Sequence, residues 1–146
     1  MYHGKPIWVL AANAGFAKLW TAASPSADLE EFKVFENPEA RLHERDLTSD
    51  LPGRAFDSAG EGRHAMEQQV SPKKEIAIRF AQEIARYLIK NRDAMEKLYV
   101  AAGPEFLGLL RQSLNGNWDD DRLVEFSKDY TGLDGRALRS RLPDYL

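Results

Sequence analysis

Residues 5–21 carry the hydrophobic pattern of two strands joined by a tight turn. The run from Ile7 to Leu10 is continuously apolar, which is typical of a strand that is buried on both faces. Asn13 and Gly15 follow as turn residues that tolerate a positive φ, and residues 16–21 return with a second strand pattern. The segment therefore predicts a β-hairpin.

A third strand is predicted over residues 29–35, because Phe32 and Val34 alternate with the charged residues Glu31 and Lys33. This alternation is typical of a strand with one half-exposed face. The apolar periodicity then disappears between residues 37 and 71, where Pro, Gly, Ser, Asp and Arg dominate. Connections of this length in a small domain are usually functional, so we expect a long functional loop here.

The second half of the chain alternates between helical and strand patterns. Ser71 and Pro72 suit the N-cap and first position of a helix. An apolar residue follows at every fourth position, at Ile76, Phe80, Ile84 and Leu88. Further predicted elements are a buried strand at 97–102, a helix from Gly103 to about 114, a strand at 123–126 and a short helix from Asp134 to about 142.

The order of these elements predicts one α/β domain over residues 1–146. Three antiparallel strands followed by helix, strand, helix, strand and helix favour a ribonuclease-H-like mixed sheet with helices packed on it. Trp8, Trp20 and Tyr99 fall within strand patterns and are expected in the core. Trp118 follows a turn, and the sequence leaves open whether it contacts a partner or folds back on the preceding helix.

The amino-acid composition excludes several classes of protein and of functional site. Of the 146 residues, 43% are hydrophobic and 29% charged, which excludes global disorder. The chain has no cysteine, so disulfides, thiolate metal sites and cysteine nucleophiles are excluded. A net charge of -3 argues against a uniformly basic surface and still permits a local basic patch. The apolar run at 7–12 is far short of the roughly 20 residues of a membrane span, and we expect a cytoplasmic protein.

Gly60, Gly62, Arg54 and Arg63 are the residues of the long loop that could contact a ligand. Glycines allow the backbone to approach a partner closely, and arginines bind phosphate or carboxylate through paired hydrogen bonds. The alternative is that the glycines only form turns while both arginines pair with acidic neighbours. These neighbours are Asp50, Asp57 and Glu67.

Catalytic and metal chemistry find little support in the sequence. His64 and Glu67 are spaced for one helical face, but two ligands do not make a metal site, and we expect no metal and no cofactor. Adjacent Asp57 and Ser58 cannot easily flank the His64 imidazole as a hydrolase triad. The predicted first and fourth strands lack the carboxylates that a two-metal nuclease needs.

The run Pro-Gly-Arg-x-Phe-Asp-Ser-x-Gly-x-Gly-Arg-His-Ala-Met-Glu within residues 50–67 resembles the bacterial host attachment protein family. The opening strand at 8–14 also fits, although Asn13 stands where we expect Asp in many members. Further matching segments lie at 79–81, 99–101, 103–104, 107–108 and 128–131. This family resembles the middle domain of archaeal and eukaryotic peptide-release factors, whose Gly-Gly-Gln loop occupies the place of residues 60–64. The glutamine of that loop has no match here.

The resemblance implies a non-catalytic binding module that associates with the ribosome or RNA. Its candidate binding residues are Arg54, Asp57, Ser58, Gly60, Gly62, Arg63 and His64. A protein partner or homodimer is also compatible with the family. One alternative is a hydrolase with His64 as acid or base and Asp57 beside it. Another is the host-cell attachment factor that the family name suggests, which would require export.

Overall fold

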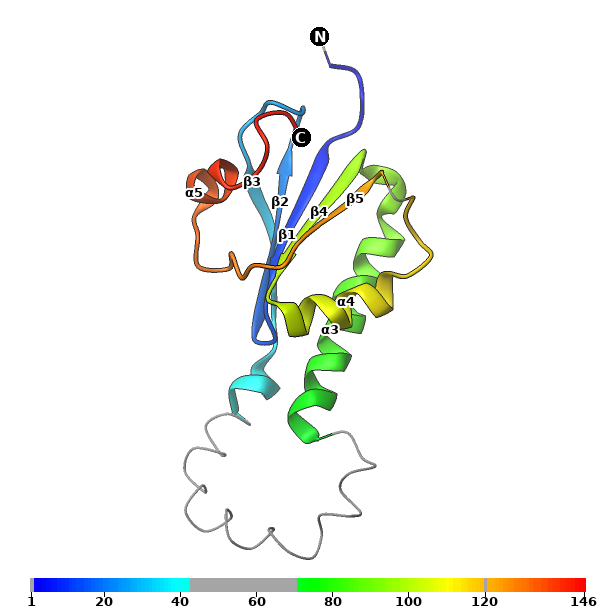
Figure 1. The fold of residues 1–146 in the computed structure, drawn as a ribbon, viewed down its shortest axis with the longest axis vertical. Coiled ribbons are helices and arrows are strands. Elements are labelled where there is room, and N and C mark those ends of the chain that lie inside the picture. The colour runs from blue at the N-terminus through cyan, green and yellow to red at the C-terminus, as the bar shows by residue number, and fades with distance from the viewer. Residues whose placement is uncertain (1, 43–70, 120) are drawn as a thin grey trace, which may run out of the picture.

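The computed structural model describes residues 2–42, 71–119 and 121–146. They form a mixed α/β fold with a five-stranded sheet (Figure 1). In chain order the elements are β1 (Ile7–Ala12), β2 (Phe16–Ala22), β3 (Glu30–Glu36), α3 (Pro72–Lys90), the 3-10 turn η1 (Arg92–Ala94), β4 (Lys97–Ala102), α4 (Pro104–Leu114), β5 (Leu123–Phe126) and α5 (Gly135–Ser140). Every strand and helix expected from the sequence in these ranges is therefore confirmed, with small shifts at its ends.

The strand order in the sheet is β3-β2-β1-β4-β5. The pairs β1–β2 and β2–β3 are antiparallel, whereas β1–β4 and β4–β5 are parallel. The strands β1, β3, β4 and β5 therefore run in one direction, and their carboxyl ends meet along one edge of the sheet. We call this edge, with the turns that follow these strands and the first turns of α3 and α4, the carboxyl edge.

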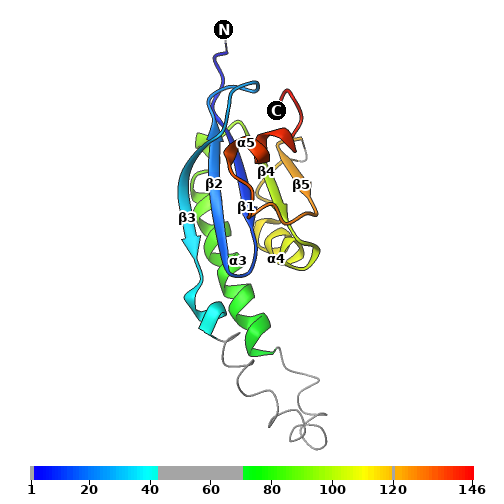
Figure 2. The same ribbon diagram turned by 90° about the vertical axis from the view of Figure 1, so that its left-hand side faces the viewer.

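Both faces of β1 are buried, as its apolar run predicts. On one face Trp8, Leu10 and Ala12 pack with α3 and α4. On the other face Ile7 and Val9 pack with Leu138 of α5 and with Trp20. Figure 2 shows α3 and α5 on opposite sides of the sheet. The sheet thus separates two apolar cores, with the two longer helices on one side and the short α5 on the other.

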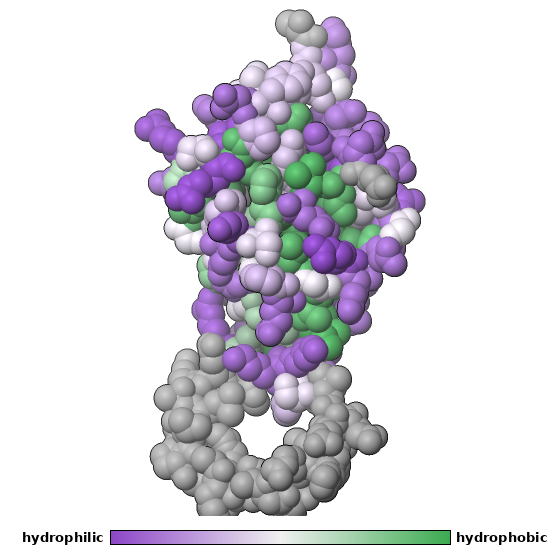
Figure 3. All heavy atoms as spheres, viewed as in Figure 1, coloured by the Kyte–Doolittle hydropathy of each residue, from purple (hydrophilic) through white to green (hydrophobic). Residues whose placement is uncertain are grey.

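Tryptophan placement follows the sequence-based expectation. Trp8 and Trp20 are 7% exposed and Tyr99 is 2% exposed, so all three are core residues. Trp118 packs against the core on the α3–α4 side, which supports the interpretation that it folds back on the helix. In the view of Figure 1, with α5 on the left and α3 on the right, hydrophobic residues gather in the middle of the molecule and hydrophilic residues lie around them (Figure 3).

The long helix α3 forms as its sequence predicts. The Ser71 hydroxyl accepts a hydrogen bond from the Lys74 amide at 3.1 Å and so caps the first turn. Pro72 follows at the first helical position, where its missing backbone N–H costs no hydrogen bond within the helix. The four apolar residues spaced by four positions are all buried, with Ala81 and Ala85 beside them. Burial of this face on the sheet accounts for the length and position of the helix.

Two local expectations were wrong. The alternation in β3 marked Phe32 and Val34 as its apolar face, yet these side chains are 41% and 43% exposed and Phe35 is the buried one. A register irregularity opposite Leu19 and Trp20 shifts the alternation, as a bulge does. The turn after β1 also uses no positive φ. Instead the Asn13 side chain accepts hydrogen bonds from the amides of Gly15 and Phe16, at 2.7 and 2.9 Å.

One boundary of the predicted loop was also wrong. The sequence indicated a loop from residue 37, but residues 38–42 are helical. Ser71 at the other boundary is the N-cap of α3, as predicted. None of the helices within the described ranges is long and apolar enough to cross a membrane.

Candidate functional site at the carboxyl edge

The seven binding residues expected from the sequence, two of which are also the catalytic candidates, lie outside the described residues. They are Arg54, Asp57, Ser58, Gly60, Gly62, Arg63 and His64. The structure does describe the positions that flank their segment. Arg41 and Ser71 line one and the same cavity at the carboxyl edge. The chain therefore leaves and re-enters the described fold at a single site.

This cavity has a volume of about 310 Å³ and is built from four parts of the carboxyl edge. The turn after β1 contributes Ala14 and Gly15, the helical turn after β3 contributes Ala40 and Arg41, and the first two turns of α3 and of α4 contribute polar and apolar side chains. The parallel strands β1 and β4 are neighbours, and the chain continues from β1 to β2 on one side and from β4 to β5 on the other, so the strand order reverses between them and makes this a switch point in the sheet. Ligands of open α/β sheets bind at the carboxyl ends of strands at such points.

The lining combines half-buried apolar residues, which we call the floor, with exposed and mostly basic residues, which we call the rim. The floor consists of Ala14, Ala40, Ala77 and Leu109. Arg41, Lys73 and Lys74 supply three positive charges, and Glu105 supplies one negative charge. Within the described ranges, neither Lys73 nor Lys74 takes part in an ion pair. The site thus carries a net positive charge on a protein that is acidic as a whole.

The two helix starts reinforce this charge. Helix α3 begins at the cavity, and its first turn includes Lys73 and Lys74. Helix α4 begins at Pro104 after the N-cap Gly103, and no side chain of the described residues caps its first turn. Backbone amides at helix starts carry partial positive charge and favour anions. Their orientation adds to the attraction that the basic side chains exert on a negatively charged ligand.

A hydrogen-bond network fixes the turn that forms one wall of the site. The Asn13 Nδ2 donates to the Thr131 Oγ1 at 3.1 Å, and the Thr131 amide donates to the Asp129 carboxylate at 2.9 Å. Asn37 follows β3 and is buried, and its Nδ2 donates to the Ala14 carbonyl at 3.0 Å. The segments that follow β1, β3 and β5 are therefore tied together at the carboxyl edge.

An ion-pair cluster lies beside the cavity. Arg79 contacts Glu75 at 3.1 Å and Glu39 at 3.4 Å, which links α3 to the helical turn after β3. All three side chains are more than half exposed, and surface pairs of this kind add little to stability. The cluster carries one positive and two negative charges, so it lowers the net positive charge around the cavity by one unit and leaves the basic side chains in excess.

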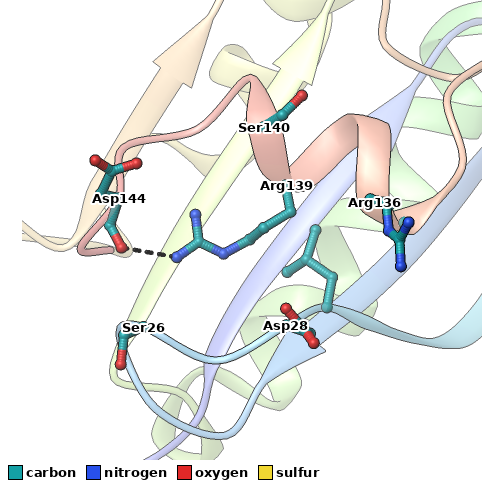
Figure 4. A pocket seen from close by; sticks show the side chains of 8 residues that line it. Ser26, Asp28, Arg136, Arg139, Ser140 and Asp144 are labelled. Atoms are coloured by element: carbon teal, nitrogen blue, oxygen red, sulfur yellow. Dashed lines mark hydrogen bonds between the residues drawn. The ribbon is translucent and has the colours of Figure 1, made fainter.

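A second cavity of about 580 Å³ lies on the other side of the sheet, between α5 and the β2–β3 connection (Figure 4). Its central side chain, Arg139, donates to four backbone carbonyls, those of Pro25, Ala27, Pro143 and Asp144. Arg139 therefore holds the structure together and has little capacity left for a ligand. We place the functional site at the carboxyl edge.

The carboxyl edge offers little for metal or acid–base chemistry. Over residues 2–42, 71–119 and 121–146, no group of three or more His, Asp or Glu side chains could hold a metal ion. The one carboxylate at the cavity, Glu105, lies among basic groups. What the arrangement supports is binding of a phosphate-bearing ligand.

Sequence reasoning found part of this site. The predicted cap at Ser71 located the start of α3, and Lys73 and Lys74 lie in its first turn. No local pattern predicts that Arg41 and the turn after β1 line one cavity with these lysines, because their proximity depends on strand pairing. The spacing of Asn13 and Gly15 is the one local signal for the turn, since asparagine commonly accepts from amides that follow it.

Comparison with known proteins supplies a family. A family model described as "Protein required for attachment to host cells" matches residues 8–142. None of the curated proteins compared with the chain matches it. Among solved structures, the chain is similar to a chain of the PilM-PilN type IV pilus biogenesis complex, with 18% identity and a TM-score of 0.40, covering 96% of this chain and 43% of that one.

An archaeal actin homolog is a second structural relative. It has 12% identity and a TM-score of 0.41, and the match covers 96% of this chain and 50% of that chain. The chain thus spans half or less of the length of both solved structures.

Proposed function

This chain belongs to the family of proteins required for attachment to host cells, and within that family we propose that it is a non-catalytic module that binds RNA, free or in the ribosome. The binding surface is the carboxyl edge of the sheet together with the segment that carries Arg54 and Arg63. The family description names a requirement for attachment and no molecular mechanism. RNA binding is the mechanism that the charges at the carboxyl edge support.

The observation that carries this proposal is the basic rim of the cavity. Arg41, Lys73 and Lys74 surround a space between the first turns of two helices. RNA presents regularly spaced phosphates, and their neutralisation by Lys and Arg supplies most of the sequence-independent affinity. The apolar floor made by Ala14, Ala77 and Leu109 is suited to the face of a nucleotide base that is not paired.

The segment between residues 42 and 71 extends the proposal. Arg54, Arg63 and His64 supply further phosphate contacts, and Gly60 and Gly62 let the backbone approach the RNA. Asp57 and Ser58 complete the binding set as hydrogen-bonding groups. The support is that Arg41 and Ser71, on either side of this segment, line the basic cavity. In chain order this segment takes the place of the Gly-Gly-Gln loop of release-factor middle domains, and this analogy is what favours the ribosome as the RNA-containing partner.

The same reasoning extends to fold type and location. The three antiparallel strands and the two parallel strands that follow support assignment of the sheet to the ribonuclease-H-like type. A ribosome-associated role requires the protein to act in the cytoplasm. Direct attachment at the cell surface is the second candidate function, and the family description is what favours it.

The test is RNA binding by charge variants with a matched control. We expect Lys73→Ala/Lys74→Ala to weaken binding of a labelled single-stranded RNA about tenfold or more at low salt, and to lower the salt slope by about 1.4. Arg86→Ala/Lys90→Ala removes the same charge from the other end of α3, where both residues are exposed. This control should change the affinity less than about twofold, because these residues lie away from the cavity.

Fluorescence anisotropy at several salt concentrations measures both effects. Equal losses in the two double variants would mean that net charge alone drives binding, and the carboxyl edge would be the wrong site. Arg54→Ala/Arg63→Ala is the corresponding test of the segment, and it should weaken co-sedimentation with ribosomes. Unchanged co-sedimentation of that variant would remove the segment from the proposal.

A further inference from the structure

The strand β3 forms one edge of the sheet. It is seven residues long and pairs only with β2 among the strands of the described fold. Figure 2 shows it along the margin of the molecule, with its outer side turned away from β2. An exposed edge of this length is a template on which another chain can add a strand.

Hydrogen bonding fixes which residues face outward. The Asn37 amide donates to the Gly15 carbonyl at 3.0 Å, and the strand register continues from this pair to Phe35 and Lys33. In an antiparallel ladder, hydrogen-bonded and non-bonded positions alternate. The backbone groups of Lys33 and Phe35 therefore point to β2, and those of Val34 and Glu36 point outward, away from the sheet.

Apolar side chains accompany these free backbone groups. Val34 is 43% exposed and Phe32 is 41% exposed, two of the four large exposed hydrophobic residues in the described fold. Phe32 rests edge-on against Trp8, with ring centroids 4.8 Å apart, so a core residue fixes its position. The edge thus offers one apolar contact on either side of the strand.

The charge of this edge is acidic. Glu30, Glu31 and Glu36 are exposed on the strand, and Asp28 is exposed just before it. The one lysine of the strand, Lys33, lies with its ammonium 5.0 Å and 4.8 Å from the ring centroids of Phe35 and Tyr87. The Lys33 ammonium therefore lies over the α3 side of the sheet and away from the outer edge of β3, where it does not neutralise the glutamates.

We propose that the outer edge of β3 receives an extended basic segment of a protein partner, which pairs with Val34 and Glu36 as a sixth strand. Lysines or arginines of that segment lie opposite Glu30 and Glu36, and its apolar side chains cover Val34 and Phe32. This inference is independent of the proposed RNA site, since β3 contributes no residue to the basic cavity.

The negative charge of the β3 edge favours a basic partner segment over a second copy of this chain. Two β3 edges would bring like-charged strands together, because each has three glutamates and one lysine. Opposed like charges destabilise strand pairing. The register irregularity next to Phe32 also twists the edge and disfavours a flat symmetric pairing. A basic partner gains from the same charges that repel a second copy.

The experiment adds model peptides to the full-length protein and follows backbone amides by NMR. The probe is a peptide of alternating lysine and valine, as long as β3, and its counterparts replace lysine by glutamate or valine by proline. We expect only the lysine–valine peptide to slow hydrogen exchange of the Val34 and Glu36 amides. Protection that is absent, or that falls outside β3, would overturn the proposal, as would equal binding of the glutamate peptide.

Variants of the protein supply a second readout, which is the affinity for the lysine–valine peptide. Glu30→Gln/Glu36→Gln should lower the peptide affinity about threefold to tenfold, since each removes one cross-strand charge pair. Glu83→Gln/Asp93→Asn removes the same charge elsewhere and should leave the affinity unchanged. Lys73→Ala/Lys74→Ala should also bind normally, which separates this site from the RNA site. Dimerisation that Val34→Pro abolishes would identify a second copy as the occupant instead.

Discussion

Asn13 and Thr131 are separated by 118 positions in the chain and are joined by a hydrogen bond of 3.1 Å from the Asn13 Nδ2 to the Thr131 Oγ1. Thr131 is 7% exposed and donates its amide and hydroxyl to Asp129. The bond therefore couples the turn after β1 to the segment after β5. Because Ala14 and Gly15 line the basic cavity, this long-range contact fixes the shape of the proposed RNA site.

The first prediction concerns this coupling. Asn13→Ala removes one donor and the acceptor for two amides, and we expect it to lower the free energy of unfolding by about 1–3 kcal/mol. A double-mutant cycle with Thr131→Val should give a coupling energy of about 0.5–1.5 kcal/mol. Urea unfolding of the four proteins measures both quantities. Strictly additive effects would show that the bond contributes nothing beyond the two separate side chains.

The turn at Asn13 illustrates what the sequence reveals and what it does not. Asn13 and Gly15 predict a turn, and the hairpin between β1 and β2 confirms it. The conformational reason was different, since the asparagine side chain rather than a positive φ forms the turn. The bond to Thr131 joins residues that only the folded sheet brings together, and no local pattern encodes such a contact.

Helix α3 and strand β3 show the same difference between what local sequence predicts and what the tertiary fold decides. In α3 the cap at Ser71 and the apolar spacing are local signals, so sequence reasoning located the helix. In β3 the local alternation pointed to Phe32 and Val34, but the register with β2 buried Phe35 instead. The meeting of Arg41 with Lys73 and Lys74 likewise requires the tertiary fold. Local propensity therefore predicts elements, and strand register decides which residues share a site.

A second prediction uses two glycines as a matched pair. A Cβ atom at Gly135 would lie 2.9 Å from the Trp20 Cζ3 in the core, so Gly135→Ala should destabilise the protein by about 1–3 kcal/mol through overpacking. Gly108 lies inside α4 with no heavy atom within 4 Å of such a Cβ. Gly108→Ala should therefore stabilise it by about 0.5–1 kcal/mol. Thermal unfolding of both variants measures the effects, and shifts of the same sign would contradict this packing argument.

A third prediction concerns Arg139. Its guanidinium donates to carbonyls of the β2–β3 connection and of the segment after α5 (Figure 4). Arg139→Ala should lower the free energy of unfolding by about 1.5–3 kcal/mol. Arg139→Lys should recover little of this, because an ammonium cannot reproduce the planar set of donors. Arg136→Ala changes an exposed residue of the same helix and is the control. A loss as large in that control would show that helix charge, and not these hydrogen bonds, is responsible.

The last prediction separates stability from RNA binding at one position. Ser71 caps α3 through the Lys74 amide and lines the basic cavity. Ser71→Ala removes the cap and should cost about 1 kcal/mol of stability, while RNA affinity at low salt stays within about twofold. Ser71→Asp restores a good cap and adds a negative charge to the cavity, so stability should recover while RNA affinity falls about threefold or more. Denaturant unfolding and anisotropy measure the two properties on the same samples. If RNA affinity followed stability across both variants, the effect of Ser71 on binding would be structural, and the cavity would not be the place where phosphate binds.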